Sequence, residues 1–298
     1  MRALVVGQGG IGQLYTRVLK ELALEVVTVD HKPGLADYVE LPSDLGVFDL
    51  AVIATPNFTH EAWAREVATY SDIVLVEKPG VVTADAWQQL HKDFPATRFI
   101  LVKNNQWRDN IDDLKELAQT SKFINILWLN KNRIPNPGSH FTTKRMSFGG
   151  VSRDLMPHLL SLYAVLADDY TDIDIYSSEA EQTHRLEDIT STDYGIVNPL
   201  GEYDVDDTAL IKITTYKFPA QRQDWLLQCD WANGEEDRQV IEFYQDLGYM
   251  TVELGLCPES AYKSMIKDCL ANRDKDSWWY DHFKQDLWIH QKLEQLCE

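Results

Sequence analysis

Three glycines in the first dozen residues form the pattern Gly-x-Gly-x-x-Gly, at Gly7, Gly9 and Gly12. The pattern follows a short apolar run, Leu4–Val6, and opens a stretch of helical composition, Ile11–Leu22. In that context the first glycine permits a tight turn, the second lets a phosphate approach the backbone, and the third allows close helix–strand packing. The helix N-terminus offers N–H groups and a positive dipole to the phosphates of a dinucleotide. The residues expected at those phosphates are Gly7, Gln8, Gly9, Gly10, Ile11 and Gly12.

An acidic residue ends the second predicted strand, Glu25–Asp30. A carboxylate at Asp30 can accept hydrogen bonds from the ribose hydroxyls of an adenosine, and its charge would repel a 2′-phosphate. We therefore expect NAD as the cofactor. The next two residues, His31 and Lys32, could instead hold a phosphate, so NADP stays open as an alternative.

Three further groups of polar residues follow predicted strands or open a predicted helix: Ala54–His60, Glu77–Pro79 and Gly149–His158. Lys78 follows a buried strand at its carboxyl end, where open α/β sheets bind ligands. Partial burial would lower the pKa of this lysine, and its ammonium group could polarise a carbonyl. The alternative is a solvated lysine at the end of a strand.

Asp154 and His158 are four residues apart, so on one helix they would share a face. Pro157 is tolerated only in a first turn, which places His158 near a helix N-terminus. The helix dipole there favours the neutral imidazole of His158, whereas the charge of Asp154 favours the protonated one. Whichever effect is larger, His158 could take or return a proton. Asp154 could instead be a helix cap and His158 a structural residue. A zinc site from His140, Asp154 and His158 is disfavoured because no cysteine lies nearby, so we expect no metal.

The first 120 residues alternate between short apolar runs and helical patterns, which predicts right-handed crossovers and a doubly wound parallel sheet. Residues 50–54 and 73–76 lack polar alternation, as strands buried on both faces do. The predicted strands are Leu4–Val6, Glu25–Asp30, Asp49–Ala54, Asp72–Glu77 and Arg98–Val102, and the predicted helices are Ile11–Leu22, Thr59–Thr69 and Thr83–Lys92.

After about residue 120 the predicted strands become longer and often alternate, which is typical of an antiparallel sheet solvated on one face. An apolar helix, Pro157–Ala167, interrupts the strands, and Ser260–Gln295 is again helical. We expect a Rossmann domain at residues 1–120 and a substrate-binding and oligomerisation domain at residues 121–298. The strands predicted in this second domain are Phe123–Asn132, Ala209–Tyr216 and Leu226–Trp231.

The net charge of −19 argues against nucleic acid and anionic membranes as partners. No apolar run reaches transmembrane length, and the chain begins with an apolar strand rather than a signal peptide. The cysteines form no Cys-x-x-Cys pair, which favours reduced thiols in a cytoplasmic enzyme over a disulfide framework. The four cysteines are Cys229, Cys257, Cys269 and Cys297.

In combination, the glycine turn, residues 54–60, Glu77–Pro79 and residues 149–158 resemble the glucose–fructose oxidoreductase and inositol dehydrogenase family, Gfo/Idh/MocA. Residues 206–209 (Asp-Asp-Thr-Ala) resemble the start of a strand in that family's second domain, so the resemblance spans most of the chain. It implies an N-terminal Rossmann domain and a C-terminal α/β domain with an open, mostly antiparallel sheet. That sheet commonly mediates oligomers, so a homodimer or homotetramer is expected. The resemblance also implies an active site between the domains, at the nicotinamide.

The resemblance further implies roles for individual residues in hydride transfer. Lys78 would be the active-site lysine, and Asp154 and His158 would complete the catalytic group. Ser161 stands where many members carry an aspartate, and residues 103–108 lack the common Asn-Arg-Arg order. Both departures lie towards the substrate side and leave the substrate open. Beyond the turn, the residues expected at the cofactor are Asp30, His31, Ala54, Thr55, Pro56, Asn57, His60, Glu77 and Lys78.

From Leu117 to Arg153 the sequence has no acidic residue but six lysines and arginines. In an acidic protein this reversal predicts that some of these cations hold an anionic group of the substrate, as in a sugar acid or a phosphorylated sugar. The cations could instead pair with the acid-rich segment 168–207, or across an oligomer interface. Trp107 is a candidate for stacking on a sugar ring. The full set of candidate substrate residues is Asn105, Trp107, Arg133, His140, Lys144 and Arg153.

These features predict an NAD(P)-dependent oxidoreductase that acts on the CH–OH or C=O group of a polyol, aldose or sugar acid. A reductase of imines or conjugated alkenes is the alternative among enzymes. A catalytically silent, dinucleotide-binding regulator is the alternative outside them. Lys78, Asp154 and His158 favour the enzyme, because a regulator needs none of them.

Overall fold

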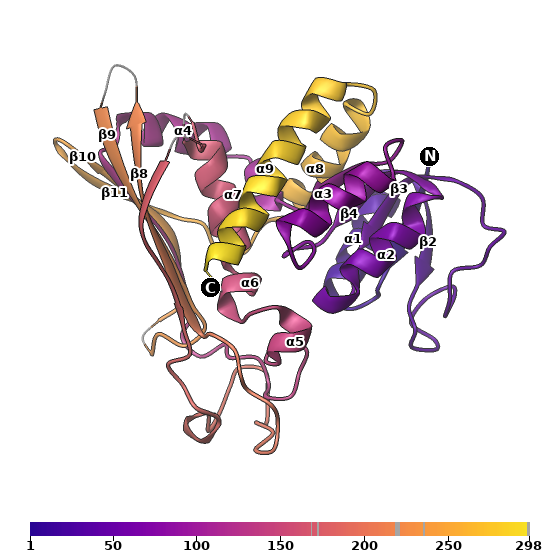
Figure 1. The fold of residues 1–298 in the computed structure, drawn as a ribbon, viewed down its shortest axis with the longest axis horizontal. Coiled ribbons are helices and arrows are strands. Elements are labelled where there is room, and N and C mark those ends of the chain that lie inside the picture. The colour runs from indigo at the N-terminus through magenta and orange to yellow at the C-terminus, as the bar shows by residue number, and fades with distance from the viewer. Residues whose placement is uncertain (168, 172, 218–220, 235, 297–298) are drawn as a thin grey trace. The chain divides into compact units, whose positions relative to one another are not determined.

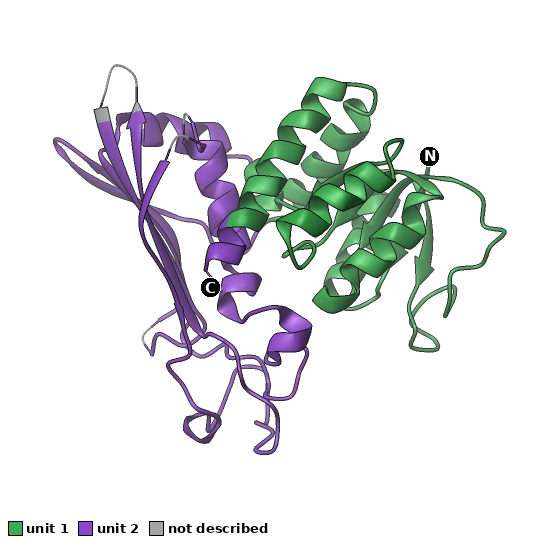
Figure 2. Ribbon diagram, in the orientation of Figure 1, with its two compact units in different colours: residues 1–107, 258–291 green, residues 108–257, 292–298 purple. Residues whose placement is uncertain are grey.

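The computed structural model describes residues 1–298 except 168, 172, 218–220, 235 and 297–298 (Figure 1). Asp168, which begins the acid-rich segment, and Cys297 therefore lie outside the described residues. The chain divides into two compact units (Figure 2). Unit 1 comprises Met1–Trp107 and Pro258–Gln291, and unit 2 comprises Arg108–Cys257 and Lys292–Glu298. The division differs from the expected boundary at residue 120, because the segment 258–291 packs with the N-terminal sheet.

Unit 1 contains a parallel sheet in the order β2-β1-β3-β4-β5, which confirms the predicted Rossmann architecture. The central strands are apolar on both faces and almost completely buried, as expected for a sheet covered on both sides. Its strands are β1 (Arg2–Val6), β2 (Glu25–Val29), β3 (Phe48–Ile53), β4 (Ser71–Val76) and β5 (Arg98–Leu101). Its N-terminal helices are α1 (Gly10–Glu21), η1 (Asn57–Thr59), α2 (His60–Ala68), α3 (Ala84–Asp93) and η2 (Asn104–Trp107).

The helical stretch predicted at residues 260–295 forms two helices, α8 (Glu259–Ala271) and α9 (Asp276–Gln295). α8 contacts α1, where the rings of Tyr262 and Tyr15 meet edge to face at 5.4 Å. α9 covers the free edge of β5, where the Asp286 carboxylate accepts a hydrogen bond from the Leu101 N–H at 2.9 Å. The C-terminal helices are therefore built into the Rossmann unit.

Unit 2 contains a six-stranded sheet in the order β11-β10-β6-β9-β8-β7. β6 and β9 pair in parallel and the other neighbours pair antiparallel, which confirms the predicted open, mostly antiparallel sheet. The strands are β6 (Phe123–Leu129), β7 (Ile173–Glu181), β8 (Thr208–Lys217), β9 (Gln221–Asp230), β10 (Arg238–Gln245) and β11 (Gly248–Glu253). Of these, β7, β10 and β11 were not among the predicted strands.

The helices of unit 2 pack on one another and on this sheet. The apolar α7 contacts β6 and β9, and α4 contacts β10 and α7. Because α7 is apolar on nearly all sides, most of its residues are buried. The helices are α4 (Ile111–Thr120), α5 (Lys144–Ser147), α6 (Val151–Asp154), α7 (Met156–Leu166) and η3 (Leu186–Asp188). Among the described residues, no helix is long and apolar enough to cross a membrane.

A buried ion pair between Lys103 and Asp286 joins the end of β5 to α9, and both side chains are at most 1% exposed. Burial raises the pKa of Asp286 to about 6 and lowers that of Lys103. We expect Asp286→Asn to lower the free energy of unfolding by about 3–5 kcal/mol, because it leaves a buried ammonium without a counter-ion. Adding Lys103→Met should recover most of the loss, because the buried charge is then gone. Urea unfolding measures both effects.

Asp281→Asn is the matched control for this prediction. Asp281 also pairs with a lysine on α9, Lys284, but its side chain is 72% exposed, so stability should change little. If Asp286→Asn destabilises the protein no more than Asp281→Asn does, the buried pair is not the stabilising contact described here.

His282 of α9 stacks on Trp107 and contacts Trp278. Burial lowers its pKa to about 2, far below the unfolded value near 6.5. A depressed folded pKa gives stability that is present above pH 6.5 and is lost as the pH falls. His282→Phe keeps a ring but cannot be protonated, so we expect it to gain stability relative to the wild type, by roughly 1–3 kcal/mol at pH 4.5. Urea titrations at pH 7 and 4.5 test this, with the exposed His31→Asn as the control; parallel curves for His282→Phe and the wild type would contradict it.

Candidate functional site

The candidate residues of unit 1 gather at the carboxyl edge of the parallel sheet. The first residue after each of four strands continues the sheet hydrogen bonds, with its N–H bound to the last residue of a neighbouring strand. These bonds, at 2.8–3.0 Å, run from Gly7 to Val29, Ala54 to Val6, Glu77 to Ile53 and Val102 to Val76. The hydrogen bonding of the sheet therefore continues into the first residue of each loop.

The three glycines of the turn differ in whether the structure has room for a side chain at their position. Gly7 has φ +92°, and a Cβ there would lie 2.4 Å from the Ala54 carbonyl oxygen. A Cβ on Gly12 would lie 1.8 Å from the Gly7 carbonyl oxygen, so α1 can approach the strand only with glycine at this position. A Cβ on Gly9 would meet nothing within 4 Å. Gly7 and Gly12 are thus required by packing, whereas Gly9 faces open space at the N-terminus of α1.

This open space fits the phosphates of a dinucleotide. Gly9 is the N-cap of α1 and supplies no capping side chain. The first N–H groups of a helix have no carbonyl one turn earlier, so an anion can accept their hydrogen bonds. Gly10 and Ile11, the first residues of the helix, are exposed here.

Asp30 directly follows β2 and helps to hold the turn. One carboxylate oxygen accepts the Gln8 N–H at 2.7 Å and the other accepts the Lys32 N–H at 2.8 Å. Burial alone would raise the pKa of Asp30, but these two hydrogen bonds lower it below its usual value. Each oxygen of the ionised group retains acceptor capacity for a ribose hydroxyl. The His31 ring is largely exposed, 3.4 Å from the same carboxylate.

The loop after β3 is held from inside by His60. Its ring is fully buried and lies between the Thr55 carbonyl oxygen, at 2.8 Å from Nε2, and the Gly80 carbonyl oxygen, at 2.9 Å from Nδ1. His60 therefore joins the loop after β3 to the loop after β4, a position different from the expected contact with cofactor. Ala54, Thr55 and Pro56 are partly exposed, and Asn57 is buried at the start of η1.

Lys78 lies on the loop after β4 and is half-buried. The neighbouring Glu77 is buried, and it accepts the Tyr15 hydroxyl at 2.9 Å and the Lys78 N–H at 3.2 Å. The Lys78–Pro79 peptide is cis. Gly80 has φ +85°, and a Cβ there would lie 2.4 Å from the His290 ring, so glycine lets α9 approach this loop.

In unit 2, Asp154 and His158 lie on two successive helices, so the single helix expected from their spacing is interrupted at Leu155. α6 ends at Asp154 and α7 begins at Met156, and the His158 N–H bonds to the Leu155 carbonyl oxygen at 3.0 Å. Pro157 lacks the N–H that would continue α6, which is a physical reason for the break. Asp154 does not cap α7 through its side chain.

Tryptophans from neighbouring strands contact both side chains. Trp231, directly after β9, donates its Nε1–H to the Asp154 carboxylate at 3.0 Å. Trp128 of β6 stacks on the His158 ring at 5.4 Å. Both Asp154 and His158 remain partly exposed. The parallel pairing of β6 with β9 thus places the two tryptophans that orient them.

Asp206 positions the start of α6. Its carboxylate accepts the Gly150 and Ser152 N–H groups at 2.9 and 2.7 Å, and its carbonyl oxygen accepts the Val151 N–H at 2.9 Å. A Cβ on Gly150 would lie 1.8 Å from that carbonyl oxygen, which explains the glycine before the helix. The sequence showed Asp206 only as the start of a strand, because its partners are more than 50 residues away.

The candidates for contact with substrate are mostly engaged within their own units. Trp107 is partly exposed; it stacks on His282 and donates its Nε1–H to Asp268 at 3.1 Å. Asn105 is fully buried. His140 is partly exposed and packs against Phe141 at 4.1 Å.

Cations of the basic stretch pair with acids of unit 2. Arg133 contacts Asp193 at 3.9 Å and forms an ion pair with Asp237. Arg145 lies 3.6 Å from Glu202. These contacts support the alternative in which the basic stretch meets acids within the chain. Lys144 is exposed and its N–H bonds to Asp204, while Arg153 is buried.

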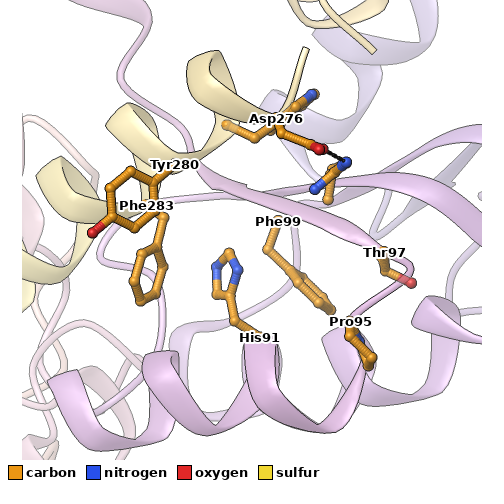
Figure 3. A pocket seen from close by; sticks show the side chains of 9 residues that line it. His91, Pro95, Thr97, Phe99, Asp276, Tyr280 and Phe283 are labelled. Carbon is orange, nitrogen blue, oxygen red and sulfur yellow. Dashed lines mark hydrogen bonds and ion pairs between the residues drawn. The ribbon is translucent and has the colours of Figure 1, made fainter. Parts of the chain in front are cut away.

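A cavity of about 340 Å³ in unit 1 lies at the opposite edge of the sheet, beside Arg98 at the start of β5. Figure 3 shows the His91 ring between Phe99 and Phe283, with Tyr280 next to Phe283 and Asp276 among the residues that line the cavity. Burial lowers the pKa of His91 to about 4, so this ring is neutral near pH 7. The cavity is largely apolar and lies away from the loops that carry the glycine turn and Lys78. Within the described residues, no three His, Cys, Asp or Glu side chains are grouped as a metal site.

Sheet order and the glycine turn define a dinucleotide-binding protein of the Rossmann class. Residues 1–101 match the model of an oxidoreductase family with an NAD-binding Rossmann fold, GFO_IDH_MocA. The N-terminal third of the chain is therefore similar to the Gfo/Idh/MocA oxidoreductases, the family that its motifs resemble.

One curated relative is a putative UDP-kanosamine synthase oxidoreductase subunit from Amycolatopsis mediterranei (strain S699). It is 28% identical over 184 residues, a match that covers 56% of this chain and about half (51%) of the relative. The chain thus spans about half the length of the curated relative it matches.

Solved structures share the fold over nearly the whole chain. GenD2 from gentamicin A biosynthesis, in complex with NAD, has a TM-score of 0.74 at 18% identity and covers 99% of this chain and 93% of its own. A putative myo-inositol dehydrogenase from Sinorhizobium meliloti 1021 has a TM-score of 0.72 at 16% identity, and the match covers 99% of this chain and 96% of the dehydrogenase. Levoglucosan dehydrogenase, in complex with NADH and levoglucosan, has a TM-score of 0.71 at 14% identity, and the match again covers 99% of this chain and 96% of the other.

The glycine geometry predicts that two alanine substitutions will separate folding from binding. Gly9→Ala adds a methyl group where nothing lies within 4 Å, so the melting temperature should stay close to the wild type. The same methyl group would occupy the space offered to phosphate, so the Kd for NADH should rise about tenfold or more. Gly12→Ala places its methyl group against the Gly7 carbonyl, so it should lose stability as well as binding. NADH fluorescence titration and thermal melting test both; unchanged NADH affinity in Gly9→Ala would contradict this assignment.

Proposed function

We propose that this chain is an NAD-dependent dehydrogenase that transfers hydride to or from a carbon bearing a hydroxyl or carbonyl group. The observation that carries the proposal is the arrangement at the carboxyl edge of one sheet. It joins the open N-terminus of α1 at Gly9, the ionised Asp30 after β2 and the half-buried Lys78 after β4. The first two features bind a dinucleotide, and the third adds a group that a binding protein does not need.

The residues of unit 1 would hold the cofactor in three places. The N–H groups at the start of α1 bind the pyrophosphate, and the Asp30 carboxylate accepts hydrogen bonds from the adenosine ribose. That charge disfavours a 2′-phosphate, so NAD is preferred over NADP. Thr55, Pro56 and Asn57 line the loop after β3. When bound, the nicotinamide supplies the hydride acceptor or donor.

Lys78 acts on the substrate oxygen in this proposal. Its ammonium group stabilises negative charge that develops on that oxygen as a carbonyl is reduced or an alcohol is oxidised. The family resemblance assigns Asp154 and His158 to the same reaction, in which they take or return the hydroxyl proton. Their contacts with Trp231 and Trp128 hold both groups in fixed orientations while leaving them partly exposed.

The names of proteins with a similar fold support a substrate class for this proposal. Proteins with this fold include a putative myo-inositol dehydrogenase and a levoglucosan dehydrogenase, which are named for polyhydroxylated substrates. We therefore propose a small sugar, polyol or sugar acid. We assign neither Arg133 nor Arg145 to a carboxylate of such an acid, because both face acids of unit 2.

A screen of polyols, aldoses and sugar acids with NAD, read as NADH absorbance, tests the proposal. With the best substrate, kcat/KM should be higher for NAD than for NADP. Lys78→Ala should lower kcat about 10²- to 10⁴-fold while the Kd for NADH stays near the wild-type value. The exposed Lys92→Ala on α3 is the control and should change neither value. Tight NADH binding with no turnover of any substrate would instead favour a dinucleotide-binding regulator.

A further inference from the structure

A single buried carboxyl group joins the cofactor helix to the active-site loop. The Tyr15 hydroxyl of α1 donates a hydrogen bond to Glu77 Oε1 at 2.9 Å, across 62 residues of sequence. Tyr15 is fully buried, and Glu77 is 8% exposed. The second oxygen, Oε2, accepts the Lys78 N–H at 3.2 Å. The chain of contacts therefore runs from the side chain of α1 to the backbone of the lysine itself.

The position of the Tyr15 side chain is fixed relative to the glycine turn, because both belong to the start of α1. Gly12 and Tyr15 are three residues apart on α1, so they lie on the same face, and both are buried. Gly12 fixes the distance between α1 and the strands, because there is no room for a side chain beneath it. Tyr262 of α8 packs edge to face against the Tyr15 ring and supports it. The hydroxyl of Tyr15 is thus held by rigid packing.

Glu77 needs its partners because it is buried. Burial raises the pKa of Glu77, opposed by the Lys78 charge and by the hydrogen bonds from Tyr15 and from the Lys78 N–H. A buried carboxyl group that loses a donor is destabilised, and it regains hydration only by moving. Loss of the Tyr15 hydroxyl therefore acts on the loop that carries Lys78 more than on α1.

Other contacts hold the following residues of the same loop. His60 binds the Gly80 carbonyl oxygen, and the Val81 N–H donates to His290 Nε2 at 3.2 Å. His290 Nδ1 lies 2.7 Å from the Asp286 carbonyl oxygen, so Nδ1 carries the proton and Nε2 accepts. Gly80 and Val81 are fixed by these contacts, and Glu77 fixes Lys78.

We propose that Tyr15 and Glu77 are positioning residues that set Lys78 relative to the pyrophosphate-binding turn. The inference rests on the proposed function, because it concerns how Lys78 is held for that reaction. One end of α1 binds the cofactor, and its buried face holds the lysine loop through Glu77. A displacement of about 1 Å at a reacting group can cost about 10²-fold in rate, so this link is expected to affect turnover more than cofactor affinity.

Four variants test the inference: Tyr15→Phe, Glu77→Ala, Glu77→Gln and the control Tyr280→Phe. Tyr280 belongs to the same unit and its side chain is exposed. Tyr15→Phe and Glu77→Ala should lower kcat about tenfold or more with little change in the Kd for NADH. Glu77→Gln can accept the Lys78 N–H with its oxygen and donate to Tyr15 with its amide, so it should recover most of the kcat lost in Glu77→Ala. Thermal melting verifies that each variant is folded.

Hydrogen exchange measured by mass spectrometry gives a second readout that needs no substrate. In the protein without cofactor, a peptide covering residues 77–83 should exchange faster in Tyr15→Phe and Glu77→Ala, whereas peptides from β1 and β4 should not. Equal exchange at 77–83 in Tyr15→Phe and the wild type would overturn the inference. So would a loss of kcat in Tyr15→Phe that is matched by an equal loss of NADH affinity.

The exchange result also separates this inference from the proposed function. If the wild-type protein turns over no substrate, the proposed dehydrogenase fails. Faster exchange confined to residues 77–83 would still support the link from Tyr15 through Glu77 to the Lys78 backbone. Unchanged exchange in a protein that is an active dehydrogenase would reject the link and leave the function in place.

Discussion

The close approach of α1 to the parallel sheet is the constraint on which the rest of unit 1 depends. A methyl group at Gly12 would lie 1.8 Å from a backbone oxygen, so the helix rests directly on the turn that precedes it. That contact aims the helix N-terminus at the space beside Gly9. It also brings the buried face of α1 to the loop after β4, where Tyr15 meets Glu77. One packing requirement therefore determines both the cofactor cradle and the support of the lysine loop.

Burying polar groups at this edge of the sheet carries an energetic cost, and elements distant in sequence offset it. Three of these buried groups are satisfied by contacts from other parts of unit 1: Glu77 by Tyr15, Gly80 by His60, and Val81 by His290. Asp286 does the same for the Leu101 N–H at the edge of β5. A buried polar group without a partner destabilises the folded state, so these contacts stabilise the one arrangement of the loops in which each of these groups is paired. The C-terminal helix α9 supplies two of them, so it belongs to the machinery that shapes the site.

The sequence predicted what local patterns encode and missed what depends on tertiary contact. The five strands of the first sheet, the glycine turn and Asp30 follow from apolar runs and glycine spacing, and the structure has the predicted sheet and turn. The packing of α8 and α9 with unit 1 could not be predicted locally, because their apolar residues indicate that the helices are buried but not which element they pack against. Asp206 and His290 were missed for the same reason, since their partners lie 54 and 209 residues away. The packing of Trp107 on His282 also had no local signal, because the two residues are far apart in the sequence.

The break between α6 and α7 shows how a small local feature can matter for chemistry. Asp154 ends α6 and His158 lies in the first turn of α7, with Leu155 between the two helices. Pro157 lacks the N–H that would continue α6, and each side chain contacts a tryptophan, Trp231 after β9 for Asp154 and Trp128 of β6 for His158. Asp206 then fixes the first turn of α6 with its carboxylate, so the orientation of Asp154 depends on the start of β8 as well as on β9. The orientation of both side chains therefore depends on strands that lie more than 50 residues away or before the helices in the chain, and the helix sequence alone does not determine it.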